Sequence, residues 1–281
     1  MTERNTDYAA TTFFSAPTGT FRQRDLPLFV AIFIIGLVIP LFINLGTVKL
    51  SVYRVILLLL FFPALHRLFS GRVGHLRLPD FCVIGICIWS SISFVFHHGL
   101  GPMVQTVGLV WVDTLGAYLL GRCYIRTPEA FYATVRLLFW LAVTLLPFAI
   151  YEAITGEAII ITLFSKVGAT YPDHWMEERM NLDRVQGPFS HPIHFGVFVL
   201  SLVGVSYYVL GYNRPWITRV FRAVIITLTG AFCLSSGPLV SVMSQLNVIV
   251  WDGIMKSVRQ RWHILLGLSA AGFIVVDLIS N

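Results

Sequence analysis

Residues 130–151, AFYATVRLLFWLAVTLLPFAIY, decide the fold class, because their only charged side chain is Arg136. A helix that crosses a bilayer needs about 20 consecutive apolar residues, and this stretch has that length. The bilayer core holds no water, so a spanning segment must satisfy its backbone hydrogen bonds internally, as a helix does. We therefore expect a membrane-spanning helix, with the long side chain of Arg136 reaching from near the inner end to the membrane surface.

The composition extends this interpretation to the whole chain. Of the 281 residues, 56% are hydrophobic and 12% are charged, and the mean hydropathy is +0.77. Soluble domains carry about 25% charged residues, so an ordinary soluble protein is excluded. On a soluble chain the net charge of +6 would suggest nucleic acid. Here the positive side chains flank apolar segments, where they orient membrane helices, and we expect no nucleic-acid partner.

We predict an all-α, polytopic transmembrane helix bundle of about nine spans. Residues 1–26 are expected to form a cytoplasmic N-terminal tail without a signal peptide, and residues 27–281 the transmembrane domain. Ser235, Ser236 and Gly237 precede Pro238 between the seventh and eighth apolar stretches, 217–234 and 238–254, as in a tight hairpin. The nine apolar stretches are 27–47, 50–69, 81–97, 103–121, 130–151, 193–211, 217–234, 238–254 and 263–280.

Lysine and arginine set the predicted orientation, because loops that stay in the cytoplasm are rich in both. With the N-terminus in the cytoplasm, the outer segments hold only Lys49, Lys166, Arg179 and Arg184. Every inner segment is basic, and this alternation holds across all nine spans. The inner segments contain Arg4, Arg22, Arg24, Arg67, Arg72, Arg77, Arg122, Arg126, Arg214, Arg219, Arg222, Lys256, Arg259 and Arg261.

One connection, residues 152–192, is much longer than the others and is expected outside the cytoplasm, as a periplasmic loop. Long loops without secondary structure are uncommon and often functional. Residues 157–167, EAIIITLFSKV, are apolar but too short to span, so we expect a short helix in the membrane interface. The cysteines lie in or beside apolar segments, away from this loop, and indicate no disulfide framework. They are Cys82, Cys87, Cys123 and Cys233.

The residues capable of chemistry gather at the end of this loop, in RVQGPFSHPIH, residues 184–194. The Gly-Pro and His-Pro steps are expected to fix turns, since proline sets its own φ and restricts the residue before it. Arg184 can hold an anionic group with a fork of donors. His191 and His194 can accept or donate a proton near neutral pH. This set suits an anionic substrate at the outer membrane surface.

Each candidate also has a purely structural interpretation. Arg184 could pair with Asp183 in a solvated loop, and the two histidines could be helix-start residues. With His174 or Asp173 the histidines could bind a metal, but the spacing is loose, and we predict neither a metal site nor a cofactor.

Ionisable residues at the spans are further candidates, since charge inside a bilayer is costly. Arg54 is expected at the outer face, where it could reach headgroups or, with Arg179, help to bind an anion. Asp113 is expected in the middle of the fourth span, paired with an arginine or in a proton path. Glu152, at the outer end of the fifth span, could act beside the loop, although a solvated end charge is the simpler interpretation.

Residues 184–196, RVQGPFSHPIHFG, resemble the R-x-x-G-x-F-x-x-P-N-x-x-G type segment of O-antigen ligases and of O-antigen or exopolysaccharide polymerases. Residues 227–241, TLTGAFCLSSGPLVS, resemble the helix hairpin that follows in that family. The chain departs from the family at His194, near the usual asparagine, and in the hairpin, where the family often has Ser-Arg. The family continues into a second large outer loop, so the resemblance implies that this chain is the N-terminal part of such a protein.

The resemblance implies a metal-independent glycosyltransferase of the bacterial inner membrane. It would transfer a glycan from an undecaprenyl-diphosphate carrier to a saccharide or lipid acceptor, among membrane lipids and other polysaccharide-assembly proteins. Arg184 would contact the diphosphate and Gly187 would shape the turn, whereas His191 and His194 are acid/base candidates by their chemistry alone. Two other classes stay open: a transporter or flippase subunit that depends on Asp113 and Arg54, and a non-catalytic scaffold of an envelope complex.

Overall fold

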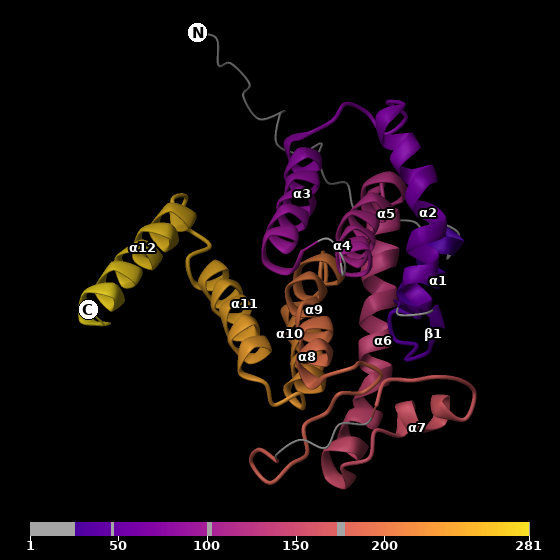
Figure 1. Ribbon diagram of the computed structural model, residues 1–281. Coiled ribbons are helices and arrows are strands. Elements are labelled where there is room, and N and C mark those ends of the chain that lie inside the picture. The colour runs from indigo at the N-terminus through magenta and orange to yellow at the C-terminus, as the bar shows by residue number, and fades with distance from the viewer. Residues whose placement is uncertain (1–25, 46–47, 100–102, 173–177, 281) are drawn as a thin grey trace.

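The computed structural model describes residues 26–45, 48–99, 103–172 and 178–280. Over these residues the fold is almost entirely helical, with one two-stranded sheet (Figure 1). The predicted helical class is confirmed, and five helical segments of the described chain are long and apolar enough to cross a membrane. They are α2 (Val52–Phe69), Leu78–His97 of α3 (Leu78–His98), α6 (Pro128–Thr155), the composite helix Pro192–Leu210, and Arg261–Ile279 of α12 (Arg261–Ser280).

The helix α6 runs through the middle of the bundle (Figure 1). Thr127 caps its first turn by accepting a hydrogen bond from the backbone nitrogen of Ala130 at 3.1 Å, and Pro128 takes the first helical position, where no N–H is needed. Gly156 ends the helix in the left-handed conformation, with φ +74°. The 28 residues are about 42 Å long, against about 30 Å for the bilayer core, so an end of α6 can extend beyond the apolar layer.

The main core forms where α6 meets the helices that follow the long loop. These are α8 (Pro192–Leu200), α9 (Leu202–Val205), the π-helix η3 (Ser206–Leu210) and α10 (Trp216–Ala231), with α11 (Ser236–Ile254) packed on α8 and α9. Glycines allow the close approach: a Cβ at Gly230 would lie 2.4 Å from Leu200 Cδ2. Small residues at helix contacts are typical of bundles in membranes.

The predicted helix over 103–121 is present but changes its pitch in the middle. The helices α4 (Met103–Val110) and α5 (Ala117–Tyr124) are joined without a break by the π-helix η2 (Trp111–Gly116). Short π-helical segments often occur at functional sites. Here η2 packs on α2, with an ideal Cβ of Gly116 lying 3.5 Å from Leu57 Cβ, and it carries Asp113.

The first apolar stretch, 27–47, is not one helix as predicted. The helix α1 (Leu28–Gly36) is only about 13 Å long, too short to span by itself. Pro40 has no N–H to continue the helix and disfavours helical geometry at Ile39. An antiparallel hairpin follows, β1 (Phe42–Leu45) and β2 (Val48–Ser51).

The extended residues that follow α1 nevertheless continue the path of this stretch along the bundle. Near its start, Phe29 packs edge-on against Tyr124 at the end of α5, with ring centroids 4.5 Å apart. After the short helix, Phe42 packs against Tyr171 of the long loop, with centroids 5.5 Å apart. The stretch therefore connects the end of α5 to the long loop, although only part of it is helical.

The long loop is shorter than predicted, because α6 continues to Thr155. Residues 152–155, which were predicted to begin the loop, are therefore helical. The short helix expected at 157–167 is present as α7 (Ile159–Ser165), which packs on α6. The loop is fastened to the hairpin by an antiparallel bridge between Leu41 and Thr170, and by a 2.9 Å hydrogen bond between the hydroxyls of Ser51 and Tyr171. The loop, the hairpin and the α10–α11 turn thus gather at one end of the bundle (Figure 1).

The opposite end holds the basic connections. Arg122 of α5 donates to the carbonyls of Val73 and His75, at 3.3 and 3.2 Å, and contacts the buried carboxylate of Asp80 at 3.2 Å. The same carboxylate accepts a hydrogen bond from the backbone nitrogen of Arg77 at 2.6 Å. The α2–α3 connection is therefore held by a charged network in addition to the apolar packing of the buried Val73.

Candidate functional site

Residues 183–187 form the centre of the candidate site, where the loop passes between the end of α6 and the α10–α11 turn. The backbone nitrogen of Asp183 donates to Ala153 O at 3.1 Å, and that of Val185 donates to Phe232 O at 3.1 Å. Val185 is fully buried between these partners. The loop segment is thus tied by its backbone to two separate helices.

Glu152 fixes the next turn of the loop. Its side chain is buried, with 4% of the residue exposed, and its carboxylate accepts hydrogen bonds from Gln186 N at 2.7 Å and Gly187 N at 3.1 Å. The simpler prediction, a solvated end charge, is therefore wrong, because the loop folds back over the end of α6. A carboxylate that accepts two backbone N–H bonds satisfies donors that would otherwise be buried without a partner.

Gly187 has φ +55°, a conformation that other residues adopt only with strain. An ideal Cβ at this position would lie 3.0 Å from Phe195 Cδ2. Both facts fit the expected turn-shaping role of Gly187. The ring of Phe195 packs directly against the turn. Phe195 itself is fully buried in the main core.

Arg184 reaches across to the α10–α11 turn. Its Nη2 donates to Ser235 Oγ at 2.8 Å, and it forms no ion pair with Asp183, the structural alternative left open by the sequence. Arg184 Nε is buried and has no hydrogen-bond partner among the described residues. A buried guanidinium donor without a partner is energetically costly, which makes it a candidate contact for an anionic or polar ligand.

Arg179 approaches the same turn from a second direction. Its Nη1 donates to Leu234 O at 3.0 Å. A tight β-turn holds it in place: the backbones of Arg179 and Leu182 exchange hydrogen bonds of 3.0 and 3.1 Å, and Met180 and Asn181 between them have φ of +57° and +59°. Two guanidinium groups therefore meet consecutive residues of one turn, Leu234 and Ser235.

Gln186 adds a second buried polar atom without a partner. Its Nε2 donates to Pro172 O at 3.2 Å, whereas its Oε1 is buried without a hydrogen bond from any described residue. Gln186 and Ser235 were not candidates in the sequence, although both lie in the quoted segments. A glutamine and a serine do not indicate a binding site by their type alone. Only the fold brings Ser235 to within hydrogen-bond distance of Arg184.

The two histidines lie at the start of α8. His191 is the N-cap, and its Nδ1 accepts a hydrogen bond from Ile193 N at 3.1 Å. His194 Nδ1 lies 3.0 Å from Ser190 Oγ, and the two imidazole ring centroids are 6.2 Å apart. Both histidines therefore lie at the start of α8 with a hydrogen bond each, as in the helix-start interpretation, and the His194 side chain is exposed.

Arg54 belongs to a different cluster. Its guanidinium holds the Asp113 carboxylate with two parallel contacts, Nη2–Oδ2 at 2.7 Å and Nε–Oδ1 at 3.0 Å, and Nη1 donates to Lys49 O at 3.1 Å. The expected pairing of Asp113 with an arginine is therefore confirmed. No contact between Arg54 and Arg179 or Arg184 is present in the described part of the chain.

Within the described ranges, no group of three histidine, cysteine, aspartate or glutamate side chains is arranged to hold a metal ion. The metal candidates Asp173 and His174 lie outside the described residues. All four cysteines have free thiols.

The apolar helices place the chain in the class of helical membrane proteins. No family model, curated protein or solved structure matches the chain.

Proposed function

We propose that the chain is a bacterial inner-membrane glycan polymerase or ligase. It transfers a glycan from an undecaprenyl-diphosphate carrier to a saccharide or lipid acceptor, without a metal or cofactor. The observation that carries the proposal is the buried Nε of Arg184, which has no hydrogen-bond partner among the described residues, while Arg179 meets the same turn. Two guanidinium groups held at one turn suit a diphosphate, which carries two adjacent anionic groups.

In this reaction the bond between the glycan anomeric carbon and the diphosphate oxygen breaks, and a bond from that carbon to the acceptor hydroxyl forms. Arg184 and Arg179 stabilise the departing diphosphate, whose negative charge grows as the bond breaks. His194, exposed beside Ser190, accepts the proton of the acceptor hydroxyl. His191 caps α8 and holds this turn in place. Glu152, held by two backbone N–H groups, positions the loop in this scheme.

The proposal includes a membrane topology of about nine spans, with the N-terminus in the cytoplasm and the long loop in the periplasm. It is supported by the basic connections, which lie at the end of the bundle opposite the long loop (Figure 1). We expect an impermeant thiol reagent to label Met180→Cys in intact cells and His75→Cys only after permeabilisation, since both residues are exposed in the fold. The reverse labelling pattern contradicts the topology.

The decisive experiment replaces Arg184 with alanine and with lysine in cells that make the polymer. Arg184→Ala is expected to abolish polymerisation or ligation, and Arg184→Lys to lower it strongly, because lysine keeps the charge but not the forked donors. The exposed Arg72 offers a matched control, since it belongs to the α2–α3 connection, at the end of the bundle opposite the long loop. Normal polymer length and amount in the Arg184→Ala cells, at wild-type protein level, would contradict the proposal.

A transporter or flippase subunit is the second candidate, and the Arg54–Asp113 pair favours it. An ion pair on a π-helical segment within apolar helices is the kind of group that carries protons or ions through a bundle. Substrate uptake by reconstituted vesicles that requires Asp113 and not Arg184 would support this class over the first.

A further inference from the structure

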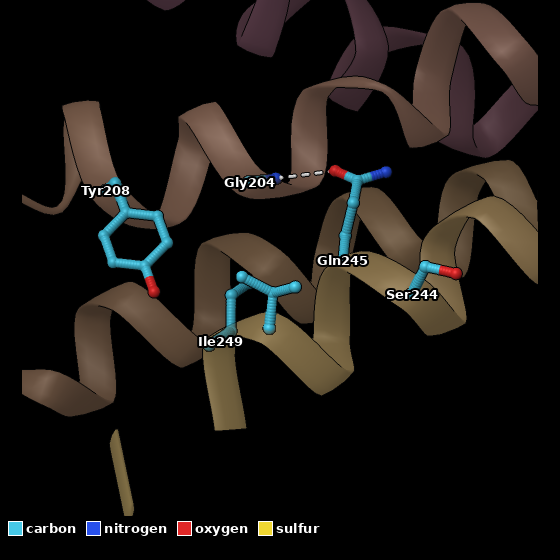
Figure 2. A pocket seen from close by; sticks show the side chains of 6 residues that line it. Gly204, Tyr208, Ser244, Gln245 and Ile249 are labelled. Carbon is cyan, nitrogen blue, oxygen red and sulfur yellow. Dashed lines mark hydrogen bonds between the residues drawn. The ribbon is translucent and has the colours of Figure 1, made fainter. Parts of the chain in front are cut away.

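A groove of about 260 Å³ lies between the α9–η3 segment and α11 (Figure 2). It shares no residue with the candidate site of the loop. It forms where the composite helix is interrupted after Leu200 and before it widens into the π-helix η3; Gly204, between these two points, has no side chain to fill the space. Its lining residues are Gly204, Tyr208, Ser244, Gln245, Val248 and Ile249.

The polar groups of this lining are engaged by the protein itself. Gln245 Oε1 accepts a hydrogen bond from Gly204 N at 3.1 Å (Figure 2), and Gln245 Nε2 donates to Leu200 O at 3.0 Å. The Ser244 hydroxyl donates to Val240 O of its own helix at 3.0 Å. The surface left for a ligand is therefore carbon, and only an apolar chain gains by entering it.

The groove has a charged end. The Tyr208 hydroxyl donates to Asp252 Oδ2 at 3.1 Å, and Arg261 Nη2 contacts Asp252 Oδ1 at 3.0 Å. This ion pair bridges the end of α11 and the start of α12. The connection between α11 and α12 joins these two helix ends. Its exposed Lys256 and Arg259 form no ion pair within the described chain.

We infer that the groove binds one hydrocarbon chain of an anionic phospholipid, with the phosphate beside Lys256 and Arg259. The carbon lining selects the chain, and the two unneutralised cations at the charged end select a negative headgroup. The volume lies below the about 300–1,000 Å³ of sites for drug-sized ligands, so the groove holds only a segment of one chain. This inference does not depend on the proposed glycan transfer or on which side of the membrane the connection lies.

The test titrates the purified full chain in detergent with phosphatidylglycerol and phosphatidylcholine of identical acyl chains, with bound lipid counted by native mass spectrometry. Phosphatidylglycerol is expected to bind at least about tenfold more tightly. Ser244→Trp, which fills the groove, is expected to reduce that affinity by about tenfold or more. The double variant Lys256→Gln/Arg259→Gln is expected to remove most of this preference, because these two cations select the anionic headgroup.

Matched controls separate the groove from the general surface. Ser269→Trp adds the same side chain to the exposed face of α12, and Arg72→Gln/Arg77→Gln removes two charges from another connection; both are expected to bind lipid as the wild type does. Val248→Trp serves as a second groove-filling variant if Ser244→Trp does not purify as a folded monodisperse protein. Equal binding of the two lipids, wild-type binding by the groove variants, or an equal loss in the controls overturns the inference.

Discussion

The carboxylate of Glu152 lies 2.7 Å from the backbone nitrogen of Gln186, 34 residues further along the chain. With its second bond, to Gly187 N, it holds the turn from which Arg184 extends to Ser235. The end of α6 thereby fixes the position of the loop that carries the proposed chemistry.

We expect Glu152→Ala to destabilise the protein more than Glu152→Gln does. Alanine leaves two buried N–H donors without an acceptor, at about 1–3 kcal/mol each, whereas glutamine keeps one acceptor oxygen. Thermal unfolding of the purified variants in detergent measures the order. Glu157→Ala is the matched control, since Glu157 is exposed in the same loop. Equal melting temperatures for all three variants would show that the loop does not depend on Glu152.

Gly196→Ala is expected to separate α8 from the α10–α11 turn. An added Cβ would lie 2.5 Å from Cys233 Sγ and 2.8 Å from Pro238 Cβ, and neither neighbour is a flexible chain end that can move aside cheaply. Overpacking of this kind costs about 1–3 kcal/mol, and it also moves Ser235 away from Arg184. The measurement is thermal stability together with polymer synthesis in cells.

Gly267→Ala is the control for Gly196→Ala, because a Cβ at Gly267 on α12 would meet nothing within 4 Å. Unchanged stability and polymer synthesis are expected for it. If Gly196→Ala behaves in the same way as this control, the close contact between α8 and the turn does not support the site.

The Arg54–Asp113 pair is expected to show strong coupling in a double-mutant cycle. Arg54→Met or Asp113→Leu alone leaves one charged group without its partner, at about 1.5–3 kcal/mol for lost hydrogen bonds to a charge. The double variant removes both charges and is expected to recover part of that loss. Unfolding free energies of the four proteins give the coupling, and simple additivity would show that the pair contributes no interaction energy.

The helices were predictable from the sequence because their signals are local. The spans over 50–69, 81–97 and 130–151 appear in the fold as α2, α3 and α6, and α7 was expected from a short apolar run. The first stretch was not predicted correctly, because apolarity alone does not distinguish a helix from the extended residues around Pro40 and the hairpin after it. Whether all nine stretches span the membrane stays a prediction.

The candidate site was predictable only as a list of residue types. Arg184, Gly187, His191 and His194 were selected because proline and glycine fix turns and because arginine and histidine have suitable chemistry. The burial of Glu152 could not be predicted, since it depends on backbone groups 34 and 35 residues away. Neither could the partner of Arg184, 51 residues distant.

The sequence by itself determined that this protein consists of apolar helices with basic connections. The length, apolarity and charge of each segment decide, without any tertiary contact, whether that segment is more stable in lipid or in water. Only the tertiary structure decided which side chains meet: Glu152 beneath the loop, Arg184 and Arg179 on the Leu234–Ser235 turn, and Arg54 on Asp113. The physical reason is that hydrogen bonds and ion pairs act over about 3 Å, so they form only after packing has brought distant segments together.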